Sequence, residues 1–361
     1  MAFSWYKTVT IDHTKVPSTQ TDFPVLVSVT DADLKTVGNG GYVQNSSGYD
    51  VGFYADSGLA TKLDWETERY IATTGEVIYW VRIASLSSST DTVFYMAFGD
   101  PGISTDQSNK TGVWDSNYQT VWHLPDGTTL TAMDSTANAN DGFLSGSPTA
   151  ITGKIGGGAN LVAANSQYIQ GGNIVNTSDA TVEAWVYLTS YPSFDSMIGG
   201  FTQGNFSATY DKDLLINSIG KVVFYVYDGS TRTSTSVNSL PLNQWCHVVG
   251  TIHAGSSSLR VYINGVLEDT ASASGSYTGY SGTPNIFLGG STLAYGYLDQ
   301  KADEFRVSAS ARSSDWITAE YNNQSSPSTF ESFGAKTSVG GGGGATQPPR
   351  SMHQFRMRRA A

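Results

Sequence analysis

Cysteine and charged residues are both scarce in this chain of 361 residues. Only 14% of the residues are charged, and Cys246 is the single cysteine. One thiol excludes an intrachain disulfide, and its position in an apolar run indicates a small buried side chain. The sequence also has no run of about 18 apolar residues and no basic segment followed by an apolar one at its N-terminus. It therefore predicts neither export by a signal peptide nor membrane insertion.

Positive charge is scarce except at the C-terminus. Lys and Arg number 20 against 31 Asp and Glu, which gives a net charge of −11. The segment 345–361 holds four arginines and no acid, so removing their four positive charges leaves −15 for the rest of the chain. A body with this charge repels nucleic acid, so the sequence predicts no nucleic-acid partner.

Aromatic residues and glycine are abundant, at 12% aromatic and 39 glycines. This composition favours strands joined by tight turns, and the length suits two domains. Apolar residues alternate with period two in 77–83, 93–98 and 181–188, as expected of strands in sandwiches. Between the apolar segments 259–263 and 266–267, Asn264 and Gly265 predict a type I′ hairpin turn.

The sequence predicts an all-β fold with two β-sandwich domains and one short helix near the C-terminus. We expect a first sandwich over 1–112, a connector over 113–127, a second sandwich over 128–333, and a glycine-rich linker with a basic tail over 334–361. The helix begins at Ser314 as its N-cap and places Ile317 and Tyr321 on one face.

Four ordered motifs in the second half carry a family resemblance. They are TVEAWV at 181–186, NQWCHVV at 243–249, YING at 262–265, and the strand-and-helix segment 302–324. Together they resemble the laminin-G-like jelly rolls of the concanavalin A-like lectin/glucanase class. The resemblance implies a jelly roll used for carbohydrate or protein recognition, although the fold has no fixed activity.

The first half carries a second resemblance. Trp5-Tyr6-Lys7, DFPVLV at 22–27, Tyr79-Trp80-Val81, VWDSNY at 113–118 and VWHL at 121–124 resemble the domain-of-unknown-function family 2341. That family often precedes such a jelly roll in surface and phage proteins. The two resemblances cover residues 1 to about 333.

Oxygen-bearing side chains crowd the segment 134–142, and calcium prefers roughly six to eight oxygen ligands. The resemblance implies that this loop can lie beside a calcium site that Asp303 and Glu304 approach. We therefore expect calcium at Asp134, Asp303 and Glu304. The alternative is a loop of Asx turns that satisfies only its own backbone.

Sugar binding needs exposed aromatic rings with planar polar groups beside them. Loops of the second domain offer candidates of both kinds, and the same residues could instead cap the sandwich core. They are Tyr191, Phe194, Asp195, Tyr210, Asp211, Tyr277, Tyr280, Tyr295 and Tyr297.

Asp64, Glu66 and Glu68 alternate along one predicted strand, so they share a face with neighbours about 7 Å apart. Paired carboxylates at such separations are what glycoside hydrolysis needs. The acids lie outside the jelly roll, and we interpret them as a solvated strand face, with a hydrolase or a metal role as alternatives. His123 and His247 are interpreted as strand or core histidines, and Cys246 faces away from His247.

The tail combines guanidinium groups with apolar side chains. We expect it to be either a disordered segment or a peptide that docks on an acidic partner through Arg350, Phe355, Arg356, Met357, Arg358 and Arg359.

The leading hypothesis is a non-enzymatic recognition protein that binds a glycan or protein surface. A surface-type architecture without an export signal favours a virion surface component of a phage, made in the host cytoplasm and attached to other virion proteins by its tail. An extracellular or cell-surface protein, a purely structural assembly protein, a glycan hydrolase and a homo-oligomer stay open as alternatives.

Overall fold

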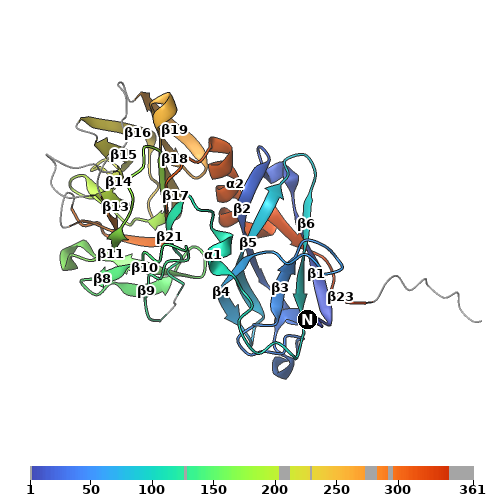
Figure 1. Ribbon diagram of the computed structural model, residues 1–361. Helices are drawn as coiled ribbons and strands as arrows, with labels where there is room; N and C mark the ends of the chain where they lie inside the picture. The colour runs from blue at the N-terminus through green and yellow to red at the C-terminus, as the bar shows by residue number, and fades with distance from the viewer. Residues whose placement is uncertain are drawn as a thin grey trace, which may run out of the picture.

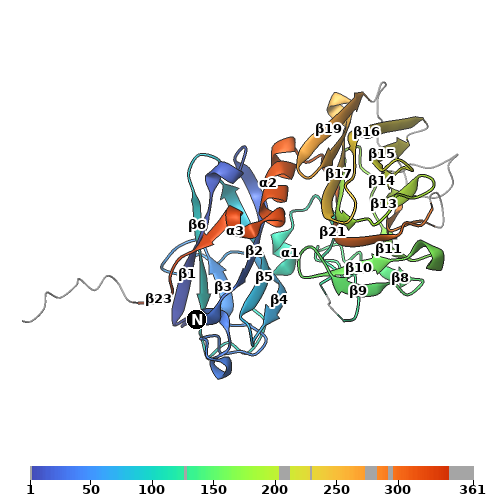
Figure 2. The same cartoon turned by 180° about the vertical axis from the view of Figure 1, so that it is seen from behind.

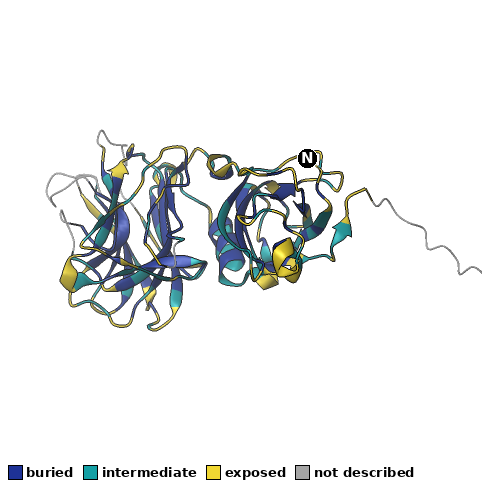
Figure 3. Cartoon of the chain, turned by 90° about the horizontal axis from the view of Figure 1, so that it is seen from below, coloured by how far each residue is buried: buried dark blue, intermediate teal, exposed yellow. Residues whose placement is uncertain are grey.

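The computed structural model describes residues 2–125, 128–202, 212–227, 230–272, 283–291 and 296–340. Four β-sheets stack in pairs as two sandwiches that lie side by side (Figure 1). The all-β prediction with two sandwiches and a short C-terminal helix is confirmed. Figure 3 shows buried residues along the strands inside both sandwiches and exposed residues mainly in the connections.

The first sandwich contains two sheets of five and three strands. One sheet consists of β1 (Trp5–Ile11), β3 (Val51–Tyr54), β6 (Thr92–Phe98), β22 (Glu331–Phe333) and β23 (Thr337–Ser338). The other consists of β2 (Gln20–Thr30), β4 (Trp65–Ile71) and β5 (Glu76–Leu86). On β5, Tyr79 and Val81 enter the sandwich core, whereas Ile78 and Trp80 face the second sandwich. Both faces of this strand are therefore buried.

The second sandwich contains sheets of eight and seven strands. The first sheet consists of β7 (Tyr118–Trp122), β9 (Thr149–Thr152), β10 (Gly157–Leu161), β12 (Ala180–Tyr187), β17 (Trp245–His253), β18 (Ser258–Ile263), β19 (Val266–Ser272) and β21 (Gln300–Ser308). The second consists of β8 (Phe143–Ser145), β11 (Tyr168–Asn173), β13 (Ser196–Thr202), β14 (Lys212–Ile216), β15 (Lys221–Tyr227), β16 (Thr231–Ser239) and β20 (Asn285–Leu288). Asn264 and Gly265 join β18 to β19 with φ values of 52° and 75°, which confirms the predicted hairpin.

The described helices are short. They are α1 (Lys110–Val113), α2 (Ser314–Ser325) and α3 (Pro327–Phe330), with 3₁₀ turns at His13–Lys15, Ala32–Leu34, Val37–Asn39, Ala163–Asn165 and Ala254–Ser256. The N-cap of α2 is Ser313, one residue before the predicted Ser314, because the Ser313 hydroxyl accepts the Trp316 N–H at 3.1 Å. Within the described chain, no helix has the length and apolarity needed to cross a bilayer.

The C-terminal segment returns to the first sandwich, which differs from the predicted domain limits. Strand β22, expected within the second sandwich at 128–333, pairs instead with β1, and Phe330 enters the first core. Helix α3 lies over the first sandwich in Figure 2. Strand β7, expected in the connector 113–127, pairs with β21 of the second sandwich. The domain limits depend on which distant strands pair with one another, and this pairing cannot be read from local composition.

Helix α2 closes the seam between the sandwiches. Trp316 and Ala319 enter the core of the first sandwich, whereas Ile317 packs against Val249 and Tyr262 of the second. The outer face of the β2-β5-β4 sheet packs on the outer face of the sheet that contains β7, β12, β17 and β21. An apolar cluster that includes Trp80, Trp114 and Val121 fills part of this seam.

Candidate functional site

An aromatic pocket opens at the edge of the second sandwich. Tyr191 and Phe194, between β12 and β13, meet Tyr297, just before β21, around a cavity of about 310 Å³. Ser190 and Asp299 line the same cavity. Three of the predicted sugar-binding aromatics, distant in sequence, thus come together at one place.

The pocket rings are held by their surroundings. The Tyr191 hydroxyl donates to the Leu240 carbonyl at 2.8 Å. The Phe194 ring lies so close to Gly296 that a Cβ there would be 2.1 Å from it. Phe194 nevertheless remains 61% exposed, which is high for a phenylalanine. The pocket therefore presents a positioned apolar ring to solvent.

The other predicted ligand residues are not in this pocket. Asp195 is exposed in the same loop but does not line the cavity. Tyr210, Asp211, Tyr277, Tyr280 and Tyr295 lie outside the described residues, as do the tail residues Arg350, Phe355, Arg356, Met357, Arg358 and Arg359.

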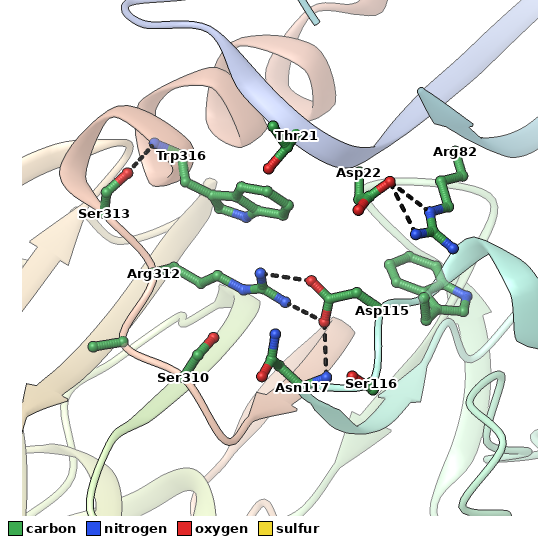
Figure 4. Close-up of a pocket in the computed structure, with 12 residues that line it drawn as sticks. Thr21, Asp22, Arg82, Asp115, Ser116, Asn117, Ser310, Arg312, Ser313 and Trp316 are labelled. Carbon is green, nitrogen blue, oxygen red and sulfur yellow. Dashed lines mark hydrogen bonds and ion pairs between the residues drawn. The ribbon is translucent and has the colours of Figure 1, made fainter. Parts of the chain in front are cut away.

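A second, larger cavity of about 600 Å³ lies at the seam (Figure 4). Its charged side chains face one another in pairs: Arg312 holds Asp115 with two hydrogen bonds of 2.8 and 3.0 Å, and Arg82 holds Asp22 at 2.9 Å. Burial raises the pKa of Asp115, but the Arg312 guanidinium outweighs it and holds that pKa below its ordinary value. The Arg82–Asp22 pair joins β5 to β2 within the first sandwich, whereas the Arg312–Asp115 pair joins the segment after β21 to the segment before β7.

Glu66 and Glu68 do not form a solvated strand face, and that interpretation is wrong. The side chain of Glu68 is 0% exposed, and Glu66 is buried, because the second sandwich covers this face of β4. Trp114 Nε1 donates to Glu66 and Trp80 Nε1 donates to Glu68, each at 2.8 Å. Sequence periodicity placed the two acids on one face correctly but did not show that another domain covers it.

His123 lies between carboxylates at the centre of the seam. Its Nδ1 is 2.9 Å from Glu304, and its Nε2 is 3.3 Å from Glu66. Burial lowers the pKa of His123, but Glu304 and Glu66 outweigh burial and raise it well above its ordinary value. Burial, with the Glu304 charge, raises the pKa of Glu68 to about 8. These shifts favour the imidazolium form of His123 and, at neutral pH, the protonated form of Glu68.

The three predicted calcium ligands do not form one site. Asp134 accepts hydrogen bonds from the backbone N–H groups of Val121, Thr136 and Asn140, which is the Asx-turn alternative. Asp303 accepts from the backbone N–H groups of Ile155 and Glu304. With their oxygens occupied in this way, Asp134 and Asp303 do not fit a shared calcium ion. Calcium binding by the chain stays a prediction.

A β-bulge explains why Asp303 and Glu304 are both removed from the sandwich core. Glu183 of β12 is opposite Arg306 and Trp185 is opposite Asp303, so β21 has one extra residue here. Glu304 takes a φ of 50°, a left-handed conformation that is uncommon outside glycine. Ala302 and Phe305 still reach the core.

Sequence reasoning missed three buried charged residues at the seam. They are Glu183, Arg306 and Glu320, which lie on or above the outer face of the second sandwich. His247 was interpreted as a strand or core histidine, and it is buried, with Cys246 on the opposite, core face. One signal in the sequence could have revealed these residues. Glu183 is a carboxylate inside an otherwise apolar strand, and because an unpaired charge is rarely buried, such a position indicates a buried partner of opposite charge.

The family comparison matches the second sandwich. Residues 158–318 match the model of the concanavalin A-like lectin/glucanases superfamily. This region is a concanavalin A-like domain. The aromatic pocket belongs largely to this domain, and the domain's outer sheet forms its side of the seam. The resemblance of residues 1–112 to family 2341 stays a prediction.

Solved structures similar to this chain include domain 4 of AbnA, an extracellular arabinanase from Geobacillus stearothermophilus, in complex with arabinotriose. That match has 18% identity and a TM-score of 0.47, and covers 56% of this chain and 97% of that one. The binding domain of Paraclostridial mosquitocidal protein 1 has 15% identity, a TM-score of 0.44, and coverage of 57% and 52%. A botulinum neurotoxin DC binding domain, in complex with SialylT, has 15% identity, a TM-score of 0.44, and coverage of 58% and 52%. This chain thus spans about half the length of each toxin domain. No curated protein matches it.

Proposed function

We propose that this protein is a non-enzymatic recognition protein that binds glycans through the aromatic pocket of its concanavalin A-like domain. The observation that carries the proposal is the convergence of Tyr191, Phe194 and Tyr297, with Phe194 exposed to solvent. An exposed ring stacks on the apolar face of a sugar, and adjacent groups such as Asp299 accept hydrogen bonds from hydroxyls.

A glycan array probed with the untagged full chain tests this proposal, once with calcium and once with a chelator. Arabinotriose and sialylated glycans belong among the probes because similar domains were solved with such ligands. We expect a restricted set of glycans to retain the chain. Retention that requires calcium would mean that a calcium ion takes part in glycan binding. If no glycan retains the chain, glycan binding is contradicted and a purely structural assembly protein is favoured.

The virion location is a separate part of the proposal. The basic tail contrasts with the acidic body, as a tether to an acidic partner requires. Strand β23 pairs with β1, so a truncation that spares the first sandwich ends at Gly340. We expect the full chain to copurify with virions of the source. The chain that ends at Gly340 should not copurify with them. Equal copurification of both would contradict a docking role for the tail.

The hydrolase alternative relied on Glu66 and Glu68. Both carboxylates lie under the second sandwich, and Glu66 is bonded to Trp114, His123 and Ser135. A substrate would have to separate the sandwiches to reach them, so these contacts support a role in the seam over one in hydrolysis.

A further inference from the structure

We propose that Glu183, His247 and Glu320 bind one divalent transition-metal cation of the zinc class between the concanavalin A-like domain and helix α2. The three residues come from β12, β17 and α2, which are far apart in the sequence. One potential ligand atom from each lies within 4.8 Å of the other two. Two carboxylates and one imidazole form an oxygen and nitrogen donor set that zinc accepts.

Strand pairing places two of the ligands. Glu183 pairs with Val249 in the β12 and β17 register, so His247, two residues earlier, is its diagonal neighbour on the same face. Helix α2 then lies over this face and brings Glu320 to it. His247 is only 1% exposed, and the side chains of Glu183 and Glu320 are 4% and 2% exposed.

Each of the three residues has a buried polar atom without a hydrogen-bond partner among the described residues. These atoms are Glu183 Oε2, Glu320 Oε2 and His247 Nδ1. Buried polar atoms are normally partnered, because burial without a partner costs free energy. Three such atoms on three neighbouring ligand-type residues indicate that a species able to accept all three lone pairs belongs between them.

The surroundings are those expected around a bound cation. The Oε1 atoms of both glutamates face Arg306, which bonds Glu320 and lies 3.8 Å from Glu183. Gln324 also donates to Glu320 Oε1 at 3.2 Å. These contacts orient the carboxylates and leave each Oε2 free.

A neighbouring cluster shows the contrast. Glu68, His123 and Glu304 also lie close together, but both ring nitrogens of His123 are occupied by carboxylates. That histidine has no lone pair to offer a metal. At the exposed group Asp12, His13 and Asp91, His13 Nδ1 is already paired with Asp91 at 2.7 Å.

The competing explanation is a proton on Glu183, whose pKa is raised well above its ordinary value by burial and by Glu320. One proton shared between Glu183 and Glu320 would partner both carboxyl groups but would leave His247 Nδ1 without a partner. A divalent cation satisfies all three atoms. It would also tie α2 to the concanavalin A-like domain, while Trp316 on the same helix is anchored in the first sandwich.

The test is a zinc titration of the untagged full chain after removal of metal with a chelator, followed by calorimetry and metal analysis. We expect one zinc per chain, a rise in melting temperature, and binding weakened at least about tenfold in His247→Gln and Glu320→Gln. His13→Gln is the matched control, and it should bind zinc as the unaltered chain does. Absence of saturable binding, or binding unchanged in His247→Gln and lost in His13→Gln, would overturn the proposal.

A spectroscopic measurement keeps the test independent of whether the variants fold. Zinc X-ray absorption of the unaltered chain loaded with one equivalent should show a single imidazole and otherwise oxygen ligands. A spectrum with no imidazole, or with two or more, would exclude this site.

Discussion

The guanidinium of Arg306 lies 4.5 Å from the ring centroid of Trp80, although the two residues belong to different sandwiches. Arg306 also bonds Glu304 at 2.7 Å and Glu320 of α2. One buried cation thus touches the first sandwich, the second sandwich and the helix between them. Burying a charge is favourable only when it is well paired, so this residue should control how firmly the sandwiches adhere.

We expect Arg306→Met to lower the free energy of unfolding by about 3–5 kcal/mol, because Glu304 and Glu320 lose their buried counter-charge. Urea denaturation measures the change. The control is Arg69→Met, which breaks a partly exposed pair with Glu76 and should cost at most about 1 kcal/mol. Equal stability of the two variants would show that the seam does not depend on Arg306.

Glu68 should make stability fall as pH rises. Burial and the Glu304 charge raise its pKa from 4.5 to about 8, so between these values the folded chain holds a proton that the unfolded chain has released. The contribution is fully present below pH 4.5 and is lost as the pH approaches 8. Since Glu68→Gln carries no titrating group, the stability of the unaltered chain relative to this variant should fall by up to about 1.4 kcal/mol per pH unit.

Denaturant midpoints of the unaltered chain and Glu68→Gln, measured from pH 5 to pH 9, check this expectation. Glu76→Gln, which replaces a partly exposed carboxylate, is the control for the substitution itself. A flat difference between the unaltered chain and Glu68→Gln would mean that Glu68 is ionised in the folded protein.

Phe194 should matter for glycan binding and not for stability. We expect Phe194→Ala to weaken binding of any glycan found on the array by at least about fivefold, since stacking on one ring is worth about 1–3 kcal/mol when the ring is lost. Isothermal calorimetry measures the binding, and the melting temperature should change little because the ring is already exposed. Gly296→Ala should act in the same direction, because its Cβ would displace the Phe194 ring.

Phe143→Ala controls for nonspecific adhesion, because Phe143 is a 70% exposed phenylalanine that does not line the aromatic pocket. It should bind glycan as the unaltered chain does. If both alanine variants lose binding equally, the aromatic pocket is not the site.

Phe330 should stabilise the first sandwich despite its position near the C-terminus. Its ring is fully buried in the core with β1 and β2, so Phe330→Ala should cost about 3–5 kcal/mol. Chemical denaturation gives the value, and the exposed Phe194→Ala serves as the reference. A loss below about 1 kcal/mol would indicate that the C-terminal segment contributes little to the first sandwich.

The sequence by itself determined the strands, the hairpin at Asn264 and Gly265, and the helix near Trp316, because alternation and turn chemistry act over a few residues. It also selected Tyr191, Phe194 and Tyr297 as ring-bearing loop residues. Only the tertiary structure brought those rings to one pocket, returned β22 to the first sandwich, and covered Glu66 and Glu68 with a second sheet. A strand's periodicity states which residues share a face, but what lies against that face is decided by contacts between segments that are distant in the chain.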